Sequence, residues 1–241
     1  MMMIVCLILA YLIGSLSMGI ILSKFMDFPD PRTQGSGSAG ATNVLRISTK
    51  NQALMVLVGD AAKGFVAVLV ARILGVQGFA LGLAALAAVI GHVFPIYFKF
   101  KGGKGVATSL GTLFGLSIFV GLIAVITWGA VAFITRYSSL ASIVTSVLSP
   151  VYIVIFSSFT YLLPVVGITL LILWKHLENI QRLKAGNEDK INFDKVEVDK
   201  DLKNVVDNIQ KKSSNIVQDL QKKGEDLAKK VKSSSDDEKK S

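Results

Sequence analysis

Residues 106–134 constrain the fold more than any other stretch: VATSLGTLFGLSIFVGLIAVITWGAVAFI, 29 residues without one charged side chain. A single α-helix of that length would be about 43 Å long, whereas the hydrocarbon core of a bilayer is about 30 Å thick. Such a helix would have to tilt by about 45°, beyond the usual range of transmembrane helices. We therefore expect a hairpin of two short helices that turns near Gly115–Gly121. One long, strongly tilted helix is the alternative.

Five other apolar stretches predict further membrane spans. They cover about residues 1–22, 52–74, 79–97, 140–156 and 161–174. Because Lys and Arg favour cytoplasmic loops, their positions place the N-terminus outside and the C-terminus in the cytoplasm, with residues 25–51 as an inner polar loop. With the hairpin included, the sequence predicts an all-α polytopic membrane protein of about seven transmembrane helices. A cleaved signal peptide is the alternative for the first stretch, although no cation precedes its apolar core.

The composition also favours a membrane protein. Of the 241 residues, 51% are hydrophobic and 18% are charged, whereas soluble domains carry about a quarter of charged residues; the mean hydropathy is +0.55. Residues 1–190 hold 14 Lys and Arg against 6 Asp and Glu. This positive excess favours anionic lipids or anionic substrates as partners, and it argues against nucleic acid. The single cysteine, Cys6, excludes an intrachain disulfide, and two histidines with few acids give no metal-ligand cluster.

The chain divides by composition into a membrane domain, residues 1–190, and a charged tail, residues 191–241. The tail contains an eleven-residue repeat over residues 202–234: LKNVVDNIQKK, SSNIVQDLQKK and GEDLAKKVKSS. A repeat of this length places apolar residues along one side of a nearly straight helix. An amphipathic helix on the membrane surface, a coiled coil and a partly disordered solubilising tail all fit this pattern.

The first segment with chemical interest is residues 32–46, RTQGSGSAGATNVLR. Backbone N–H groups beside glycine can approach an anion closely. Arg46 can hold a phosphate through two parallel hydrogen bonds. A flexible linker is the alternative. The candidate binding residues are Gly35, Ser36, Gly37, Thr42, Asn43 and Arg46.

A second glycine-rich turn lies in residues 91–109, GHVFPIYFKFKGGKGVATS. Lys104 is embedded in this turn directly before an expected helix, and a glycine turn at a helix N-terminus favours an anion. The spacing differs from that of a Walker A motif. The glycines around the lysine are Gly102, Gly103 and Gly105.

The segment WKHLENIQRLKAGNE follows the last predicted span. His176 and Asn179 are three residues apart and are expected to share a helix face. Glu178 is expected to form a structural salt bridge with Arg182. The weaker patch RYSSLAS adds Ser142 at the inner end of a helix.

Three titratable residues lie within the apolar spans. Asp60 and Lys63, three residues apart, are expected to neutralise each other, although charges inside a membrane are often functional. His92 is expected to be a packed, hydrogen-bonded histidine rather than a catalyst. Lys99 and Lys101 are expected to be membrane-edge cations that extend their charges towards water.

Four motifs, GSGSAGATNVLR, GHVFPIYFKFKGGKGVATS, RYSSLASI and HLENIQRLKAGNE, occur in the order and spacing of one bacterial family. Over residues 1 to about 190 the chain resembles the acyl-phosphate:glycerol-3-phosphate acyltransferases, often called PlsY. The resemblance implies a seven-helix enzyme of the bacterial plasma membrane whose active site faces the cytoplasm. It implies transfer of a fatty acyl group from acyl phosphate to the 1-hydroxyl of glycerol 3-phosphate, without a cofactor. The products would be lysophosphatidic acid and phosphate, in the first step of phospholipid synthesis. The soluble enzyme that makes acyl phosphate would be a partner.

The same resemblance implies roles for individual residues. Ser36 and Arg46 would belong to the active site, Lys104 and its glycines would bind glycerol 3-phosphate or the donor phosphate, and Ser142, His176 and Asn179 would complete the polar pocket. Glu178 would be structural. The family usually has Asn where this chain has Ser38, which predicts weaker contacts in that loop. His176 and a substrate phosphate oxygen are alternative acceptors of the hydroxyl proton.

Two other classes of function remain as alternatives. A transporter of small phosphorylated anions would use the glycine loops as its binding site. Against it, the cations gather at one face rather than at the midplane, and the two halves show no inverted repeat. A membrane anchor that presents the tail is the third hypothesis.

Overall fold

The computed structural model describes residues 2–191, and within that range the chain is helical and contains no strand. The α-helices are α1 (Met2–Gly14), α2 (Met18–Phe25), α3 (Ala41–Ile47), α4 (Lys50–Ile73), α5 (Gly78–Val93), α6 (Val106–Leu116), α7 (Ile118–Thr135), α8 (Ser138–Phe156), α9 (Leu162–Lys175) and α10 (Leu177–Lys184). Two short 3-10 helices are η1 (Ile96–Phe98) and η2 (Phe159–Tyr161). The predictions for the tail beyond Ile191 lie outside the described residues.

The expected hairpin over residues 106–134 is confirmed. Helix α6 ends at Leu116, and α7 follows after Ser117, whose backbone is extended (φ −158°, ψ 124°). The two helices pack so closely that a Cβ on Gly121 would lie 2.4 Å from Cγ of Phe114. The alternative of one long tilted helix is wrong, because the helix ends at Leu116.

Four helices are long and apolar enough to cross a bilayer: α4, α5 continued by η1, α7 and α8. Two bent pairs, α1 with α2 and α9 with α10, pass the same test together, which gives up to six candidate spans in the described residues. Helix α6 has 11 residues and a length of about 16 Å, so it does not cross the bilayer core alone. With α6 these helices account for the seven predicted apolar segments. The side on which each terminus lies stays a prediction.

Three details of the structure go beyond the sequence pattern. Residues 1–22 are not one helix, because α1 and α2 meet at an angle of 44°. Residues 25–51 are not only a loop, because they contain α3. Helices α9 and α10 meet at 57°, and His176 lies at this bend as the N-cap of α10, three residues before Asn179.

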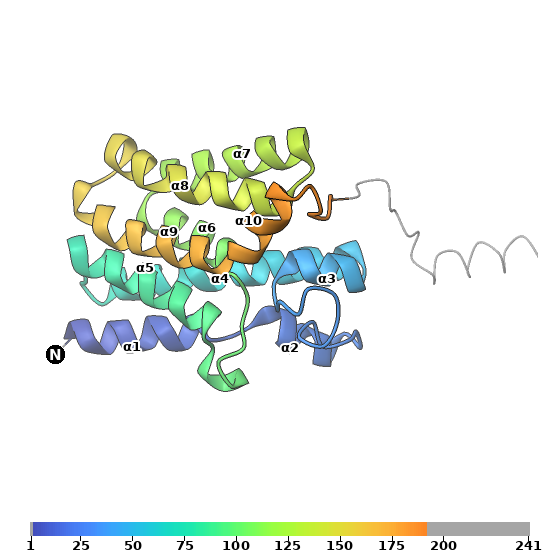
Figure 1. Cartoon of the computed structure of the whole chain (residues 1–241). Helices are drawn as coiled ribbons and strands as arrows, with labels where there is room; N and C mark the ends of the chain where they lie inside the picture. The colour runs from blue at the N-terminus through green and yellow to red at the C-terminus, as the bar shows by residue number, and fades with distance from the viewer. Residues whose placement is uncertain (1, 192–241) are drawn as a thin grey trace, which may run out of the picture. The chain divides into compact units, whose positions relative to one another are not determined.

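Glycines let the helices that carry the site approach each other closely. A Cβ on Gly64 of α4 would lie 2.2 Å from the carbonyl oxygen of Thr108 on α6. A Cβ on Gly111 of α6 would lie 1.8 Å from the carbonyl oxygen of Ala61 on α4. Small residues permit such backbone contact between membrane helices. Helices α4 and α6 therefore hold in place the loop that leads into α6. Figure 1 shows α2, α3 and α10 near one end of the bundle.

Candidate active site

The loop before α3 is built around the buried side chain of Asn43. Its amide nitrogen, which carries two N–H donors, shares them among three backbone carbonyl oxygens, those of Pro31 (2.7 Å), Gln34 (3.0 Å) and Ser38 (2.9 Å). Its amide oxygen accepts a hydrogen bond from the backbone N–H of Ser36 at 2.8 Å. Both ends of the Asn43 amide are therefore used to hold the loop in shape.

Glycine is required at two places in this loop. Gly35 and Gly37 have positive φ angles of 61° and 69°, which L-residues with a Cβ rarely adopt. A Cβ on Gly35 would also lie 2.2 Å from Oδ1 of Asn43. Ser36 stands between them with its side chain exposed. The Oγ1 of Thr42 forms a hydrogen bond of 3.0 Å with Oγ of Ser138, which ties the start of α3 to the start of α8.

The second glycine loop packs against His92. A Cβ on Gly102 would lie 2.0 Å from the carbonyl oxygen of His92, and one on Gly103 would lie 2.2 Å from its Nε2. The N–H of Gly103 donates to the same carbonyl oxygen at 3.3 Å. Gly105 has φ 90° and precedes the first residue of α6. These glycines are thus needed to bring the backbone of the loop close to α5, with Lys104 between them.

Lys104 begins a chain of hydrogen bonds that reaches the segment after α10. Its Nζ donates to Oδ1 of Asn179. The Nδ2 of Asn179 donates to Oε1 of Glu188 at 2.6 Å. The Nε of Arg182 donates to Oε2 of the same carboxylate at 2.8 Å. The Glu188 side chain is only 3% exposed, so a buried carboxylate fixes both Asn179 and Arg182 and, through Asn179, Lys104.

Glu178, in contrast, contributes little to this arrangement. The expected pair with Arg182 forms, with 3.9 Å between Arg182 Nη1 and Glu178 Oε2, but the Glu178 side chain is 87% exposed. An ion pair that is open to water adds little stability. The main carboxylate partner of Arg182 is therefore Glu188, which the motifs did not single out.

The charges in this cluster shift two pKa values. Burial, together with the positive charge of Arg182, lowers the pKa of the Lys104 ammonium to about 8, although Glu188 acts in the opposite direction. Burial tends to raise the pKa of the Glu188 carboxyl, but the hydrogen bonds from Arg182 and Asn179 more than offset this and hold its pKa below the usual value. At neutral pH the cluster therefore contains charged Lys104 and ionised Glu188.

Arg46 extends the same cluster. Its Nη2 lies 3.4 Å from Oδ2 of Asp189, next to Glu188 in the chain. Arg46 is also close enough to lower the pKa of Lys104. The segment that carries the two acids folds back, because the N–H of Ile191 donates to the carbonyl oxygen of Arg136 at 2.6 Å. Three cations, Arg46, Lys104 and Arg182, thus surround two carboxylates, and we call this set the cation cluster.

His176 and Ser142 are buried near the ends of their helices. The Nδ1 of His176 lies 2.8 Å from the carbonyl oxygen of Ile172. Because a carbonyl oxygen only accepts, Nδ1 carries a proton, and in a neutral ring Nε2 is left free to accept one. The Ser142 hydroxyl donates to the carbonyl oxygen of Ser138 at 2.7 Å and accepts from Nε1 of Trp128 at 3.1 Å. Its proton is thus committed within α8.

Comparison with known proteins identifies the family. The protein-family model described as glycerol-3-phosphate acyltransferase matches residues 4–186. The chain belongs to the glycerol-3-phosphate acyltransferase family. The acyltransferase of Coxiella burnetii (strain Dugway 5J108-111) is 55% identical over 188 residues, which are 78% of this chain and 97% of that protein. The acyltransferase of Francisella tularensis subsp. holarctica (strain LVS) is 49% identical over 185 residues, which are 77% of this chain and 91% of that protein.

Two crystal structures of an acyltransferase have the same fold. The glycerol 3-phosphate form of PlsY (YgiH), an integral membrane glycerol 3-phosphate acyltransferase, matches with a TM-score of 0.74 and 38% identity over 79% of this chain and 96% of that one. A lysophosphatidic acid form matches with a TM-score of 0.72 and 36% identity over 79% of this chain and 95% of that one. The resemblance inferred from the motifs is therefore confirmed, and so are the all-helical membrane fold and the acyltransferase function.

The acyltransferase fold brings together only some of the predicted site residues. Arg46, Lys104 and Asn179 meet in the cation cluster. Asn43, Gly102 and Gly103 instead shape the two loops. Within residues 2–191, no three His, Cys, Asp or Glu side chains lie together in a way that could hold a metal ion. Glu188 was missed because its role depends on a chain reversal after Gly186, where φ is 73°. The sequence indicated Glu188 only in that it is one of the few acidic residues among residues 1–190.

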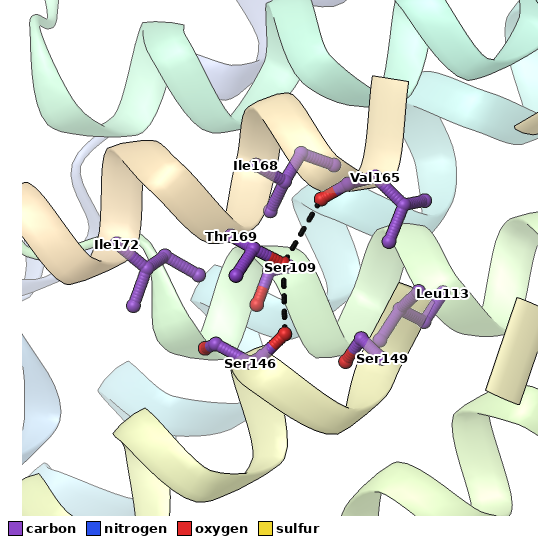
Figure 2. Close-up of a pocket in the computed structure, with 8 residues that line it drawn as sticks. All are labelled: Ser109, Leu113, Ser146, Ser149, Val165, Ile168, Thr169 and Ile172. Atoms are coloured by element: carbon purple, nitrogen blue, oxygen red, sulfur yellow. Dashed lines mark hydrogen bonds between the residues drawn. The ribbon is translucent and has the colours of Figure 1, made fainter. Parts of the chain in front are cut away.

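A small cavity lies between α6, α8 and α9 of the acyltransferase, apart from the cation cluster (Figure 2). Its lining residues are Ser109, Leu113, Ser146, Ser149, Val165, Ile168, Thr169 and Ile172. The Thr169 hydroxyl lies 2.7 Å from the carbonyl oxygen of Ser146 and 3.1 Å from that of Val165. The serine hydroxyls likewise donate to carbonyl oxygens of their own helices. The lining contains no charged side chain, so this cavity is unsuited to a phosphate.

Proposed function

We propose that this acyltransferase takes its fatty acyl group from an acyl phosphate and transfers it to the 1-hydroxyl of glycerol 3-phosphate. The products are lysophosphatidic acid and inorganic phosphate, and the active site faces the cytoplasm at the bacterial plasma membrane. The observation that carries the proposal is the cation cluster. Its three cations lie on or beside the two glycine loops, and two phosphorylated reactants need that much positive charge to lie close together.

The contacts in the cation cluster suggest a different role for each of its cations. Lys104 holds the phosphate of glycerol 3-phosphate and Arg46 holds that of the donor, because both cations are adjacent to the loops and neither is bound to a fully buried carboxylate. Arg182 is paired with the buried Glu188, so it orients that carboxylate rather than binding substrate. Asn179 aims Lys104. Ser36, exposed between two glycines, offers a hydroxyl and contributes to acceptor binding.

The donor chemistry needs no covalent intermediate on the protein. An acyl phosphate is a mixed anhydride, so its carbonyl carbon is already activated. The 1-hydroxyl oxygen of glycerol 3-phosphate attacks that carbon, a C–O ester bond forms, and the C–O bond to phosphate breaks with its electron pair on the leaving phosphate. Holding both reactants in place can supply about 7–11 kcal/mol of the barrier reduction in ideal cases.

The hydroxyl proton has two possible acceptors. One is Nε2 of His176, which its hydrogen bond to the Ile172 carbonyl leaves free in a neutral ring. The other is an oxygen of a substrate phosphate. His176→Gln distinguishes them in a turnover measurement: near-normal kcat excludes His176 as the essential base, whereas a loss of about a hundredfold or more supports it.

The donor is tested by a transfer assay on purified protein in lipid. Labelled glycerol 3-phosphate is offered with palmitoyl phosphate and, in parallel, with palmitoyl-CoA. The expected result is lysophosphatidic acid from the acyl phosphate alone, formed with a higher KM for glycerol 3-phosphate in Lys104→Ala. Product from palmitoyl-CoA at a comparable rate would contradict the proposed donor. Palmitoyl phosphate also partitions into membranes, so a soluble enzyme that makes it would deliver it at the cytoplasmic surface.

A further inference from the structure

A buried charged cluster lies between α4 and α5, inside the membrane-spanning part of the chain. It consists of Asp60 and Lys63 on α4 and His92 on α5, whose side chains are 1%, 2% and 3% exposed. Lys63 Nζ is 2.7 Å from Asp60 Oδ1 and 2.9 Å from His92 Nδ1. Burying charged side chains within a membrane is energetically unfavourable, and such residues are usually functional. The catalytic scheme above does not use any of the three.

The cluster holds the break between α1 and α2. Lys63 Nζ donates to the carbonyl oxygen of Leu16 at 2.7 Å, and the N–H of Met18 donates to Asp60 Oδ1 at 3.3 Å. A helix end leaves carbonyl groups without partners, and a helix start leaves N–H groups without partners. A cation at the first and an anion at the second complement the helix dipoles. Asp60 and Lys63 thus fix where α2 begins, and α2 leads into the first glycine loop.

The same lysine reaches the second glycine loop through His92. The three ammonium protons of Lys63 have three acceptors: Asp60 Oδ1, the Leu16 carbonyl oxygen and His92 Nδ1. Because Nδ1 accepts, the ring of a neutral His92 carries its proton on Nε2. That edge of the ring faces Gly103, where a Cβ would lie 2.2 Å from Nε2. The orientation of the ring, set by Lys63, therefore sets the position of Gly103, and Lys104 is the next residue.

We propose that Lys63 is a positioning residue for acyl transfer. It holds the His92 ring against Gly103 so that Lys104 faces Asn179. With Asp60 it also fixes where α2 begins, and α2 leads into the first glycine loop. This inference rests on the proposed role of Lys104 in binding phosphate. A merely structural ion pair is the competing explanation, since buried pairs can often be replaced by apolar residues without loss of stability.

The test uses Lys63→Met, which keeps the unbranched side chain as far as Cε and removes the ammonium group with its three donors. Arg72→Gln is the matched control, because Arg72 also lies on α4 and donates to carbonyl oxygens at another helix end, those of Gly115 (2.9 Å) and Leu116 (3.3 Å). We expect Lys63→Met to raise the KM for glycerol 3-phosphate by about tenfold or more, while Arg72→Gln leaves that KM unchanged. Equal KM values for Lys63→Met and the wild type, measured on folded protein, would overturn the proposal.

A double-variant cycle tests whether Lys63 acts on the KM through Lys104 or independently of it. If Lys63 acts through Lys104, then Lys63→Met adds nothing to the KM of Lys104→Ala. If the two effects on KM multiply, Lys63 does not act through Lys104 and the proposal is wrong. An unchanged KM in Lys104→Ala alone would instead refute the proposed function, so the two failures are distinguishable.

A second pair of variants remains informative where Lys63→Met does not fold. The side-chain oxygen of His92→Asn can still accept from Lys63, whereas His92→Leu cannot. We expect His92→Asn to retain a lower KM for glycerol 3-phosphate than His92→Leu at similar thermal stability. Equal KM values for the two would contradict a role for the Lys63–His92 hydrogen bond.

Discussion

The clearest consequence of the cation cluster is an unusually early loss of activity at alkaline pH. Lys104 is largely buried, and its pKa falls from the ordinary 10.5 to about 8 because burial and Arg182 disfavour its charge. Raising the pH through 8 should therefore discharge the phosphate-binding lysine. A solvated lysine would stay charged over the same range.

The size of the effect follows from the pKa. With a value of about 8, Lys104 is charged in about nine tenths of the molecules at pH 7, about half at pH 8 and about one tenth at pH 9. The ratio kcat/KM reports the free enzyme. We expect kcat/KM for glycerol 3-phosphate to fall about tenfold between pH 7 and pH 9.

Loss of fold would not explain this fall. The folded-state pKa of Lys104 lies below the ordinary value, so between pH 8 and about 10.5 the unfolded chain binds more protons than the folded one at this residue. Its contribution to the free energy of unfolding therefore rises with pH in that window. A thermal melt at each pH checks that the protein remains folded while activity declines.

The assay is initial-rate acyl transfer from pH 6.5 to 9.5, corrected for spontaneous hydrolysis of the donor. Lys104→Arg is the matched variant, because a guanidinium stays charged throughout this range. We expect its kcat/KM to be lower than that of the wild type but flat above pH 7. A wild-type profile that is flat to pH 9.5, or an identical decline in Lys104→Arg, would refute the assignment of the alkaline limb to Lys104.

Three further predictions test the scaffold. Gly103→Ala places a methyl group where the His92 ring lies and should raise the KM for glycerol 3-phosphate about tenfold with a smaller effect on kcat, measured by steady-state kinetics; an unchanged KM would mean that the loop can shift freely. Asn43→Ala leaves three loop carbonyls without their donor. It should lower the free energy of unfolding by about 1–3 kcal/mol in thermal melts and reduce the rate of acyl transfer. Full activity would show that the loop keeps its conformation without the Asn43 amide. Gly121→Val collides with Phe114 across the hairpin and should destabilise the protein by about 1–3 kcal/mol, measured by thermal melts in detergent; an unchanged melting temperature would contradict the close packing of α6 and α7.

Local features of the sequence were enough to predict the hairpin and the glycine loops. The uncharged run over residues 106–134 is longer than one upright span, and the cations at both of its ends, Lys104 and Arg136, favour a hairpin over one tilted helix. Lys104 could be singled out because glycines surround it before a helix. These inferences depend on length, charge and backbone freedom, which are visible without knowing any long-range contact.

The features that were missed all depend on contacts across the fold. The bend between α1 and α2 is stabilised by Asp60 and Lys63, more than forty positions further along the chain. Glu188 becomes important only when the chain reverses after α10 and buries its carboxylate. Asn43 has the side chain of a ligand-binding residue, but its amide is used by the loop. A residue type and a motif do not reveal which hydrogen bonds the fold has already used.

The cation cluster is the proposed binding site for the phosphate of glycerol 3-phosphate. The most direct test is equilibrium binding of glycerol 3-phosphate to the purified protein at pH 7, without donor, for the wild type, Lys104→Ala and the control Arg72→Gln. We expect saturable binding that weakens at least about tenfold in Lys104→Ala and is unchanged in Arg72→Gln. Equal affinity in all three proteins would place the phosphate elsewhere and contradict the central claim.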